Sequence, residues 1–274
     1  MTRHPVVEAR GRRVPKIGFG TFLMSGRSVK RAVADALAIG YRHIDTAAAY
    51  ENEREVGRAI ARSGVDRGDI WLTTKVWMDD LEPAPLRASA ERSLRLLGTD
   101  HVDLLLIHWP SRDVPLERSL DAMAGLREQA RTREIGVSNF PAGLFRQALE
   151  TAPVFCNQVE YHPFLEQDAV LGLCDEHDAM LTAYAPLAAG GVPGHPVLEE
   201  VGRAHGKTAA QVALRWLIEQ PRVVAIPKAS SHDRRAENLD VFDFQLSDEE
   251  RARIDALPKD QREFDPGWAP DWSD

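Results

Sequence analysis

Three polar residues of this chain stand at the ends of short strand-like runs, and a tyrosine follows the first of them. Asp45, Lys75 and His108 end the runs, and Tyr50 lies five residues beyond Asp45. A carboxylate, an ammonium, a phenol and an imidazole are together suited to proton transfer. They would serve a reaction in which negative charge develops on an oxygen, as when hydride adds to a carbonyl group.

The tyrosine would be the acid of such a site. A free tyrosine has a pKa of about 10, which makes it a weak proton donor at neutral pH. A neighbouring ammonium favours the phenolate, so we predict that Lys75 lowers the pKa of Tyr50. Asp45 would keep Lys75 ionised. His108 would donate a hydrogen bond to the carbonyl oxygen and orient it.

The stretch LLLIHWP, residues 104–110, explains how such residues could meet. Its four leading apolar residues are typical of a strand that is buried on both faces, as in a parallel sheet covered by helices. Pro110 cannot donate to a sheet ladder, so His108 and Trp109 are expected at the carboxyl end of that strand. In an α/β barrel the carboxyl ends of all strands converge on one mouth, where catalytic residues lie.

Strand and helix signals alternate along the whole chain, and we predict a single (β/α)8 TIM barrel domain over residues 1–274. We expect three additions to the barrel: an N-terminal hairpin (6–10 and 13–17), extra helices (197–205 and 247–257) and a C-terminal tail (258–274). The helix at 247–257 would begin with Ser247 and Glu250 as a capping box. Strands are expected at 16–20, 42–45, 71–75, 102–108, 134–138, 155–160, 180–184 and 223–226, and helices at 28–39, 52–61, 86–97, 116–131, 142–150, 168–177, 208–219 and 234–241.

The alternative architecture is a doubly wound open sheet. A nucleotide-binding sheet of that kind carries GxGxxG after its first strand, and here only the fragment GFG at 18–20 is present. Residues 186–196 hold three glycines and three prolines, so we expect a loop there, and loops of that length are usually functional.

The composition limits the classes of molecule that the protein is expected to bind. The formal net charge of −8 argues against nucleic acid or an anionic membrane surface. Two cysteines, Cys156 and Cys174, are too few for a disulfide framework, and no signal-like or membrane-spanning apolar run occurs, so we expect a cytoplasmic protein. No large apolar stripe demands a partner, and we expect a monomer with a small-molecule substrate and no metal.

The four polar residues also carry a resemblance. Asp45 and Tyr50 in HIDTAAAYENEREVGRAI, Lys75 in LTTKVW and His108 in LIHWP match the catalytic residues of the aldo-keto reductases. REIGVSNF, NQVEYHP and IPKASSHDRRAENLDVFDF extend the match over nearly the whole chain. Within the family, TREIGVSNF and the ending APDWSD are most similar to bacterial 2,5-diketo-D-gluconate reductases of the B type, which also reduce methylglyoxal.

The resemblance implies NADPH as the cofactor. By it, Ser138, Asn139 and Gln158 bind the nicotinamide carboxamide, Tyr184 stacks on the ring, Leu187 begins a loop over the pyrophosphate, and Thr21 and Asp45 also border the cofactor. Lys228 and Arg234 match the pair that grips the 2′-phosphate, and Glu237 and Asn238 match adenine contacts. The family often has Ser or Thr beside that lysine; here Ala229 stands there, and Ser230 is the expected substitute. Basic residues near a helix N-terminus also suit a phosphate on physical grounds.

Phe22, Trp77 and Trp109 fall at substrate-pocket positions of the family, beside Tyr50 and His108. Trp268 and Trp272 in the tail would either close that pocket or pack on the barrel wall. The implied function is NADPH-dependent reduction of small aldehydes and ketones, such as methylglyoxal or 2,5-diketo-D-gluconate, with Tyr50 as proton donor.

Two other functions are compatible with the same residues. One is a nicotinamide-binding sensor or partner subunit on this fold with vestigial activity. The other makes Lys75 the Schiff-base lysine of a barrel aldolase. Taken singly, each polar residue also has an ordinary structural explanation, but their joint occurrence at successive strand ends favours a catalytic site.

Overall fold

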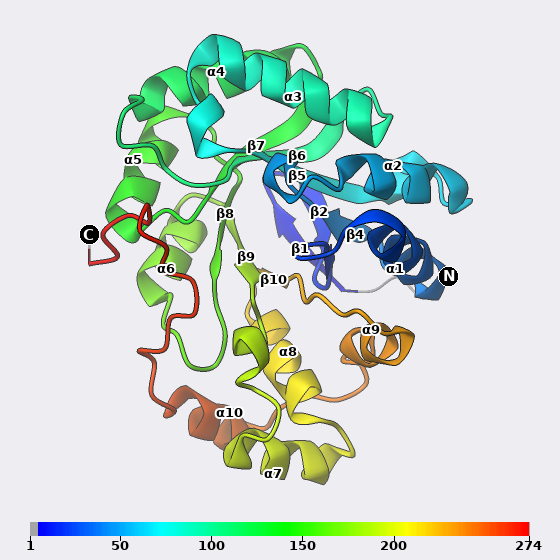
Figure 1. Cartoon of the computed structure of the whole chain (residues 1–274). Coiled ribbons are helices and arrows are strands. Elements are labelled where there is room, and N and C mark those ends of the chain that lie inside the picture. Colours follow the sequence, from blue (N-terminus) through cyan, green and yellow to red (C-terminus); the bar gives the residue numbers. More distant parts are fainter. Residues whose placement is uncertain (1–4, 274) are drawn as a thin grey trace.

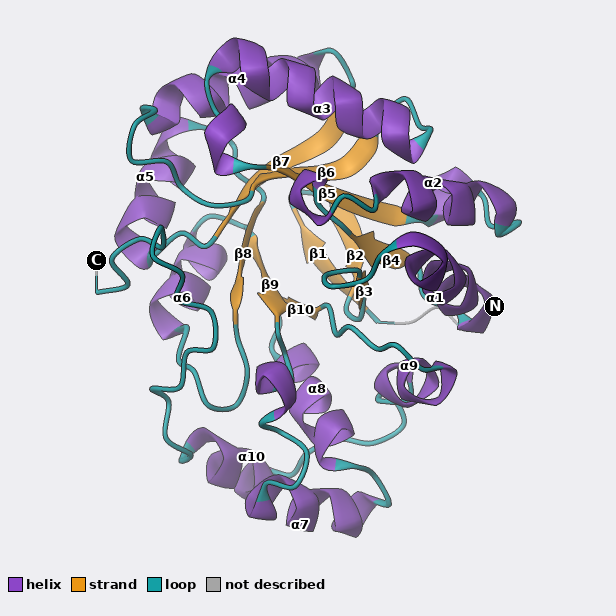
Figure 2. Ribbon diagram, viewed as in Figure 1, coloured by secondary structure: helices purple, strands orange, loops and turns teal. Residues whose placement is uncertain are grey.

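The computed structural model describes residues 5–273, so the first four residues and the last residue of the predicted domain lie outside it. Eight parallel strands form the centre and helices surround them (Figures 1 and 2). In chain order the strands are β3 (Phe19–Gly20), β4 (His43–Asp45), β5 (Trp71–Val76), β6 (Val102–Ile107), β7 (Thr132–Ser138), β8 (Cys156–Glu160), β9 (Met180–Tyr184) and β10 (Val223–Ala225), each paired with its neighbour in sequence.

The sheet closes on itself. Ile17 forms a parallel bridge with Ala225, the Gly18 amide donates to the Ala225 carbonyl at 2.8 Å, and the Ala225 amide donates to the Lys16 carbonyl at 2.9 Å. The first and last strands are therefore neighbours, which confirms the predicted (β/α)8 barrel and excludes the open sheet. Only Phe19–Gly20 of the strand expected at 16–20 is a regular ladder, and Ile17 joins through the isolated bridge.

Helices cover the outer face of the strands (Figure 2). They are α1 (Gly26–Ile39), α2 (Glu53–Arg62), α3 (Pro83–Leu97), α4 (Leu116–Glu128), α5 (Ala142–Thr151), α6 (Asp168–Glu176), α8 (Ala209–Glu219) and α9 (His232–Leu239), with α7 (Pro196–His205) and α10 (Asp248–Asp255) as the extra pair. Short 3-10 turns occupy Ala48–Tyr50, Arg67–Asp69, Met78–Asp80 and Ala188–Gly190.

Individual residues explain where several helices begin or end. Ser247 and Glu250 form the predicted capping box at the start of α10. Helix α3 begins at Pro83, before the expected residue 86, because proline suits a first helical turn. Helix α4 ends at Glu128 and not at 131, because Ala130 adopts a left-handed φ of 56° that stops the helix.

The barrel interior is apolar at the amino-terminal end of the strands and polar at the other. The hairpin of β1 (Val6–Ala9) and β2 (Arg12–Pro15) closes the amino-terminal end of the barrel. The apolar side chains that pack against this hairpin include Trp71, Leu104, Leu106, Met180 and Val224. Because side chains alternate along a strand, Asp45, Lys75, His108, Ser138, Gln158 and Tyr184 fall at inward positions towards the carboxyl ends. The fold thus gathers the predicted polar residues at one mouth.

Cys156 and Cys174 are buried free thiols. Over residues 5–273, no helix is both long and apolar enough to cross a membrane.

Candidate active site

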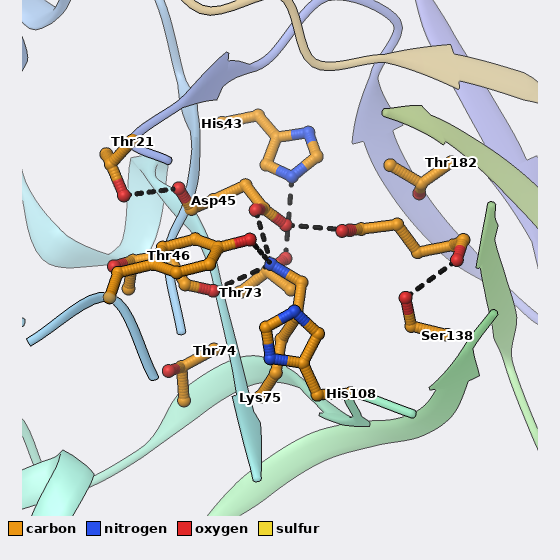
Figure 3. Close-up of polar contacts among 12 residues, drawn as sticks. Thr21, His43, Asp45, Thr46, Thr73, Thr74, Lys75, His108, Ser138 and Thr182 are labelled. Carbon is orange, nitrogen blue, oxygen red and sulfur yellow. Dashed lines mark hydrogen bonds and ion pairs between the residues drawn. The ribbon is translucent and has the colours of Figure 1, made fainter. Parts of the chain in front are cut away.

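Asp45 and Lys75 form a buried ion pair at the mouth of the barrel (Figure 3). The Lys75 ammonium lies 2.6 Å from Asp45 Oδ1, donates to the Thr46 carbonyl at 2.8 Å, and lies 3.5 Å from the Tyr50 hydroxyl. Lys75 comes from the end of β5 and Asp45 from the end of the adjacent β4, while Tyr50 comes from the 3-10 turn after β4. The structure therefore brings together three of the four residues that the sequence singled out.

The pKa of Tyr50 shifts opposite to our prediction. Burial of the phenol raises its pKa, and this effect outweighs the neighbouring Lys75 ammonium, which lowers it. Asp45 opposes the ammonium as well, because a nearby negative charge disfavours the phenolate. Burial lowers the pKa of Lys75 in turn, but Asp45 and Tyr50 together more than compensate, and the net direction is upward. Tyr50 is consequently a protonated phenol next to a charged ammonium.

His108 is the fourth residue, directly after β6. Its ring lies 5.6 Å from the Tyr50 ring and 5.2 Å from the Trp77 ring, between centroids. Burial, followed by repulsion from the Lys75 ammonium, lowers the pKa of His108 well below its ordinary value, so the imidazole is neutral. Its Nδ1 atom is buried and has no hydrogen-bond partner among residues 5–273.

Two further contacts fix Asp45. The Gln158 amide donates to Asp45 Oδ2 at 2.7 Å, so the carboxylate is held by Lys75 on one oxygen and by Gln158 on the other. The Thr21 hydroxyl, fully buried, donates to the Asp45 carbonyl at 3.0 Å. Thr21 was predicted to border the cofactor. It is not among the residues that line the cavity at this mouth, and its side chain instead holds the backbone of Asp45 in place.

His43 lies two residues before Asp45 on the same strand, and sequence reasoning overlooked it. It is buried, its Nε2 lies 3.4 Å from the Thr73 hydroxyl, and Gly18 packs so closely that a Cβ there would come within 2.7 Å of His43 Nδ1. Burial lowers the pKa of His43 to about 4.

This histidine should make stability depend on pH. Below its ordinary pKa of 6.5 the unfolded chain binds a proton that native His43 refuses, so the free energy of unfolding falls as pH drops from 6.5 towards 4. The shift corresponds to about 3 kcal/mol. Urea unfolding of wild type and His43→Gln between these pH values measures it, and the variant should lose part of the dependence, since His108 contributes with the same sign. An unchanged pH dependence in the variant would contradict the assignment.

A cavity of about 1290 Å³ opens at this mouth. Tyr50 and His108 line it together with the three aromatic residues predicted for substrate binding, Phe22, Trp77 and Trp109. The structure also answers the question of the tail tryptophans. Trp268 lines the cavity with its ring 6.1 Å from that of Trp77, whereas Trp272 packs on Trp109 and under the Arg262 guanidinium.

The cavity is also lined by Ser138, Asn139, Gln158, Tyr184 and Leu187, which were predicted to bind the cofactor. Asn139 has a left-handed φ of 63°, and its amide is already hydrogen-bonded within the chain. Asn139 Nδ2 donates to the His108 carbonyl at 2.9 Å, and its Oδ1 accepts from the Tyr184 hydroxyl at 2.7 Å. Asn139 therefore ties the strand end of His108 to the ring of Tyr184.

Residues after β10 also line the cavity: Lys228, Ala229, Arg234, Glu237 and Asn238. Within residues 5–273, neither Lys228 nor Arg234 forms a salt bridge with a carboxylate. Ser230, expected to replace the missing hydroxyl, is exposed and does not line the cavity. No cluster of residues suited to hold a metal ion occurs in the part of the chain that the structure describes.

Sequence reasoning missed Phe264, which lines the cavity from the tail, and Glu160, which holds the tail there. The Phe264 ring lies 5.6 Å from the Tyr184 ring and 6.1 Å from the Phe22 ring. The tail has no periodic pattern that would place it, and the only available signal was the presence of aromatic residues in an otherwise polar segment.

The chain is similar to several known proteins. The sequence profile of the Aldo/keto reductase family matches residues 16–259. A crystal structure provisionally described as a 2,5-diketo-D-gluconic acid reductase B superposes with a TM-score of 0.96 at 46% identity, covering 98% of each chain. Methylglyoxal reductase DkgB of Escherichia coli O157:H7 is 37% identical over 94% of this chain and 99% of its own length. An aldo-keto reductase of Bombyx mori in complex with NADP superposes with a TM-score of 0.89 at 32% identity, covering 97% of this chain and 96% of the other.

Proposed function

Because the chain belongs to the aldo/keto reductase family, we propose that it reduces small aldehydes and ketones with NADPH, dicarbonyls such as methylglyoxal or 2,5-diketo-D-gluconate among them. The observation that carries the proposal is the contact of a half-buried, protonated Tyr50 with the Lys75–Asp45 pair at the wall of the cavity. The relatives named for methylglyoxal and 2,5-diketo-D-gluconic acid support the choice of substrates.

The cavity fits a nicotinamide dinucleotide. Its two unpaired cations, Lys228 and Arg234, suit a phosphate at one end, and the aromatic face of Tyr184 suits a planar ring near Tyr50 at the other. Ser138, Asn139 and Gln158 would hold the carboxamide, which must share or replace the hydrogen bonds that Asn139 and Gln158 make within the chain. Lys228 and Arg234 would favour NADPH by charge attraction to the 2′-phosphate, while Glu237 and Asn238 would contact the adenine.

When bound, the cofactor supplies the hydride that adds to the carbonyl carbon. The chain supplies everything else. Phe22, Trp77 and Trp109 give the pocket apolar walls, and polar contacts beside such walls are stronger than in water. Neutral His108 orients the carbonyl oxygen by donating a hydrogen bond, and the Tyr50 hydroxyl transfers its proton to that oxygen.

The phenolate left on Tyr50 is stabilised by the Lys75 ammonium, 3.5 Å away in the structure, and later takes a proton from solvent. Asp45, fixed by Gln158 and Thr21, keeps Lys75 charged and in place. The same contacts disfavour the aldolase alternative. A Schiff-base lysine must be a neutral amine to attack a carbonyl, and Asp45 raises the pKa of Lys75 instead.

A rate screen tests the function. Purified protein is mixed with methylglyoxal, a keto-sugar acid or an aromatic aldehyde, and NADPH or NADH consumption is followed at 340 nm. We expect steady turnover of at least one dicarbonyl and faster turnover with NADPH than with NADH. Binding of NADPH without turnover of any carbonyl would support the sensor alternative.

Arg234→Ala tests whether this arginine recognises the 2′-phosphate of NADPH. The variant should raise KM for NADPH by about 10- to 100-fold, the loss expected for a hydrogen bond to a charged group, and leave KM for NADH nearly unchanged. Arg27→Ala, which removes an exposed arginine from helix α1, is the matched control. Equal loss with both cofactors would show that Arg234 does not recognise the 2′-phosphate.

A further inference from the structure

The C-terminal tail is fastened to the loop that follows strand β8. Figure 1 shows the tail leaving α10 and running back along the barrel. Asp260 forms an antiparallel bridge with Leu165, and the Gln261 amide donates to the Phe164 carbonyl at 3.0 Å. Lys259 adds a side-chain hydrogen bond to the Pro163 carbonyl at 2.7 Å. These contacts bring residues 262–265 to the end of β8.

Glu160, the last residue of β8, receives the tail there. Its carboxylate is fully buried and accepts one hydrogen bond on each oxygen from consecutive tail amides: Glu263 N at 2.7 Å from Oε1 and Phe264 N at 2.9 Å from Oε2. His162, also fully buried, lies with Nε2 at 2.9 Å from Oε1, and its Nδ1 accepts from the Phe164 amide. A buried carboxylate needs such donors, because desolvation without them is unfavourable.

The two amides that Glu160 accepts from set the position of Phe264. Its ring contacts Tyr184, which faces the proposed nicotinamide, and Phe22, whose ring lies 5.2 Å from that of Tyr50. Phe264 therefore forms the part of the wall between the proposed cofactor ring and the proton donor. Glu160 itself does not line the cavity; it pairs with Tyr184 along the strand ladder.

We propose that Glu160 is a positioning residue for the substrate: its carboxylate docks the tail through the amides of Glu263 and Phe264, and the docked Phe264 sets the width of the pocket. The proposal rests on the reductase function proposed above. A carboxylate is suited to docking the tail because each of its oxygens accepts hydrogen bonds, so it can bind two consecutive backbone amides at once. An amide side chain would turn an NH₂ group towards one of these N–H donors and lose that bond.

The test compares Glu160→Gln with Glu166→Gln. Glu166 lies in the same loop, and its exposed side chain makes no hydrogen bond or ion pair among residues 5–273. Glu160→Gln should raise KM for methylglyoxal by about ten-fold, the scale of one lost hydrogen bond to a charged group, and lower or leave unchanged KM for a bulky aromatic aldehyde. The kcat values and the Kd for NADPH should stay within about two-fold, and Glu166→Gln should match wild type.

A double mutant separates positioning from general destabilisation. If Glu160 acts through Phe264, then Phe264→Ala alone should raise KM for methylglyoxal as Glu160→Gln does, and combining the two should add no further change. Full additivity, or an unchanged KM in either single variant, overturns the proposal. Phe264→Ala keeps the test decisive should Glu160→Gln fail to fold.

Limited proteolysis tests the docking without any enzymatic activity. Chymotrypsin cleaves after aromatic residues, and undocking should expose the tail at Phe264. Glu160→Gln should be cut there faster than wild type and Glu166→Gln, and equal rates would contradict docking. If wild type consumes no NADPH with any carbonyl, the proposed function fails, while the cleavage rates still report on Glu160.

Discussion

Tyr50→Phe lowers kcat for carbonyl reduction by about 10²- to 10⁴-fold, the range of a general acid, and leaves the Kd for NADPH nearly unchanged. The substitution removes only the hydroxyl. The ring, which packs 5.2 Å from that of Phe22, is retained. Stopped-flow or steady-state rates with methylglyoxal, together with fluorescence titration of NADPH, measure the two quantities separately.

The pH profile of wild type sharpens this prediction. Because burial raises the pKa of Tyr50 above its ordinary value of 10.0, the phenol stays protonated through the neutral and alkaline range. The kcat/KM for reduction should therefore stay level upward from neutral pH and fall only where the free phenol finally ionises. Neutral His108, with its pKa well below 6.5, should add no step near neutral pH. A wild-type rate at Tyr50→Phe, or a decline with a midpoint well below pH 10, would contradict Tyr50 as the acid.

The barrel and the four clustered residues could be predicted because their signals are local. Runs such as 104–107 are continuous in sequence, and a polar residue at the end of each run is placed at the mouth once the strands are parallel neighbours. The direction of the Tyr50 pKa could not be predicted in this way. It depends on the balance between desolvation and an ammonium 3.5 Å away, and a sequence gives neither quantity.

Contacts between segments that lie far apart in the sequence could not be predicted from it either. Glu160 and Phe264 are 104 positions apart, and Gln158 and Asp45 are 113 apart. Gln158 was predicted to bind the cofactor, and its position at the cavity fits, but its hydrogen bond to Asp45 gives it a second task. Ser230, which similarity of side chains suggested as a substitute for the missing hydroxyl, is exposed and not among the residues that line the cavity, so its role stays a prediction.

Lys75→Met should affect both stability and turnover. The substitution leaves the Asp45 carboxylate buried with the Gln158 amide as its remaining side-chain partner, and an uncompensated buried charge costs about 3–5 kcal/mol. It also removes the ammonium that is proposed to stabilise the Tyr50 phenolate. We expect kcat to fall by about 10²- to 10³-fold, the loss seen when one preorganised charge-stabilising donor is deleted. Urea unfolding and steady-state kinetics measure the two effects.

The double variant Lys75→Met/Asp45→Asn separates these effects. Replacing the stranded carboxylate by an amide removes the buried charge, so the free energy of unfolding should recover most of the loss, whereas kcat should stay low because no cation faces the phenolate. Asp45→Asn alone should be intermediate, since the Lys75 ammonium then keeps only the Thr46 carbonyl and the Tyr50 hydroxyl as partners. Recovery of both stability and kcat in the double variant would mean that Lys75 only balances Asp45 and takes no part in proton transfer. Stability recovered without turnover assigns the ammonium to the phenolate.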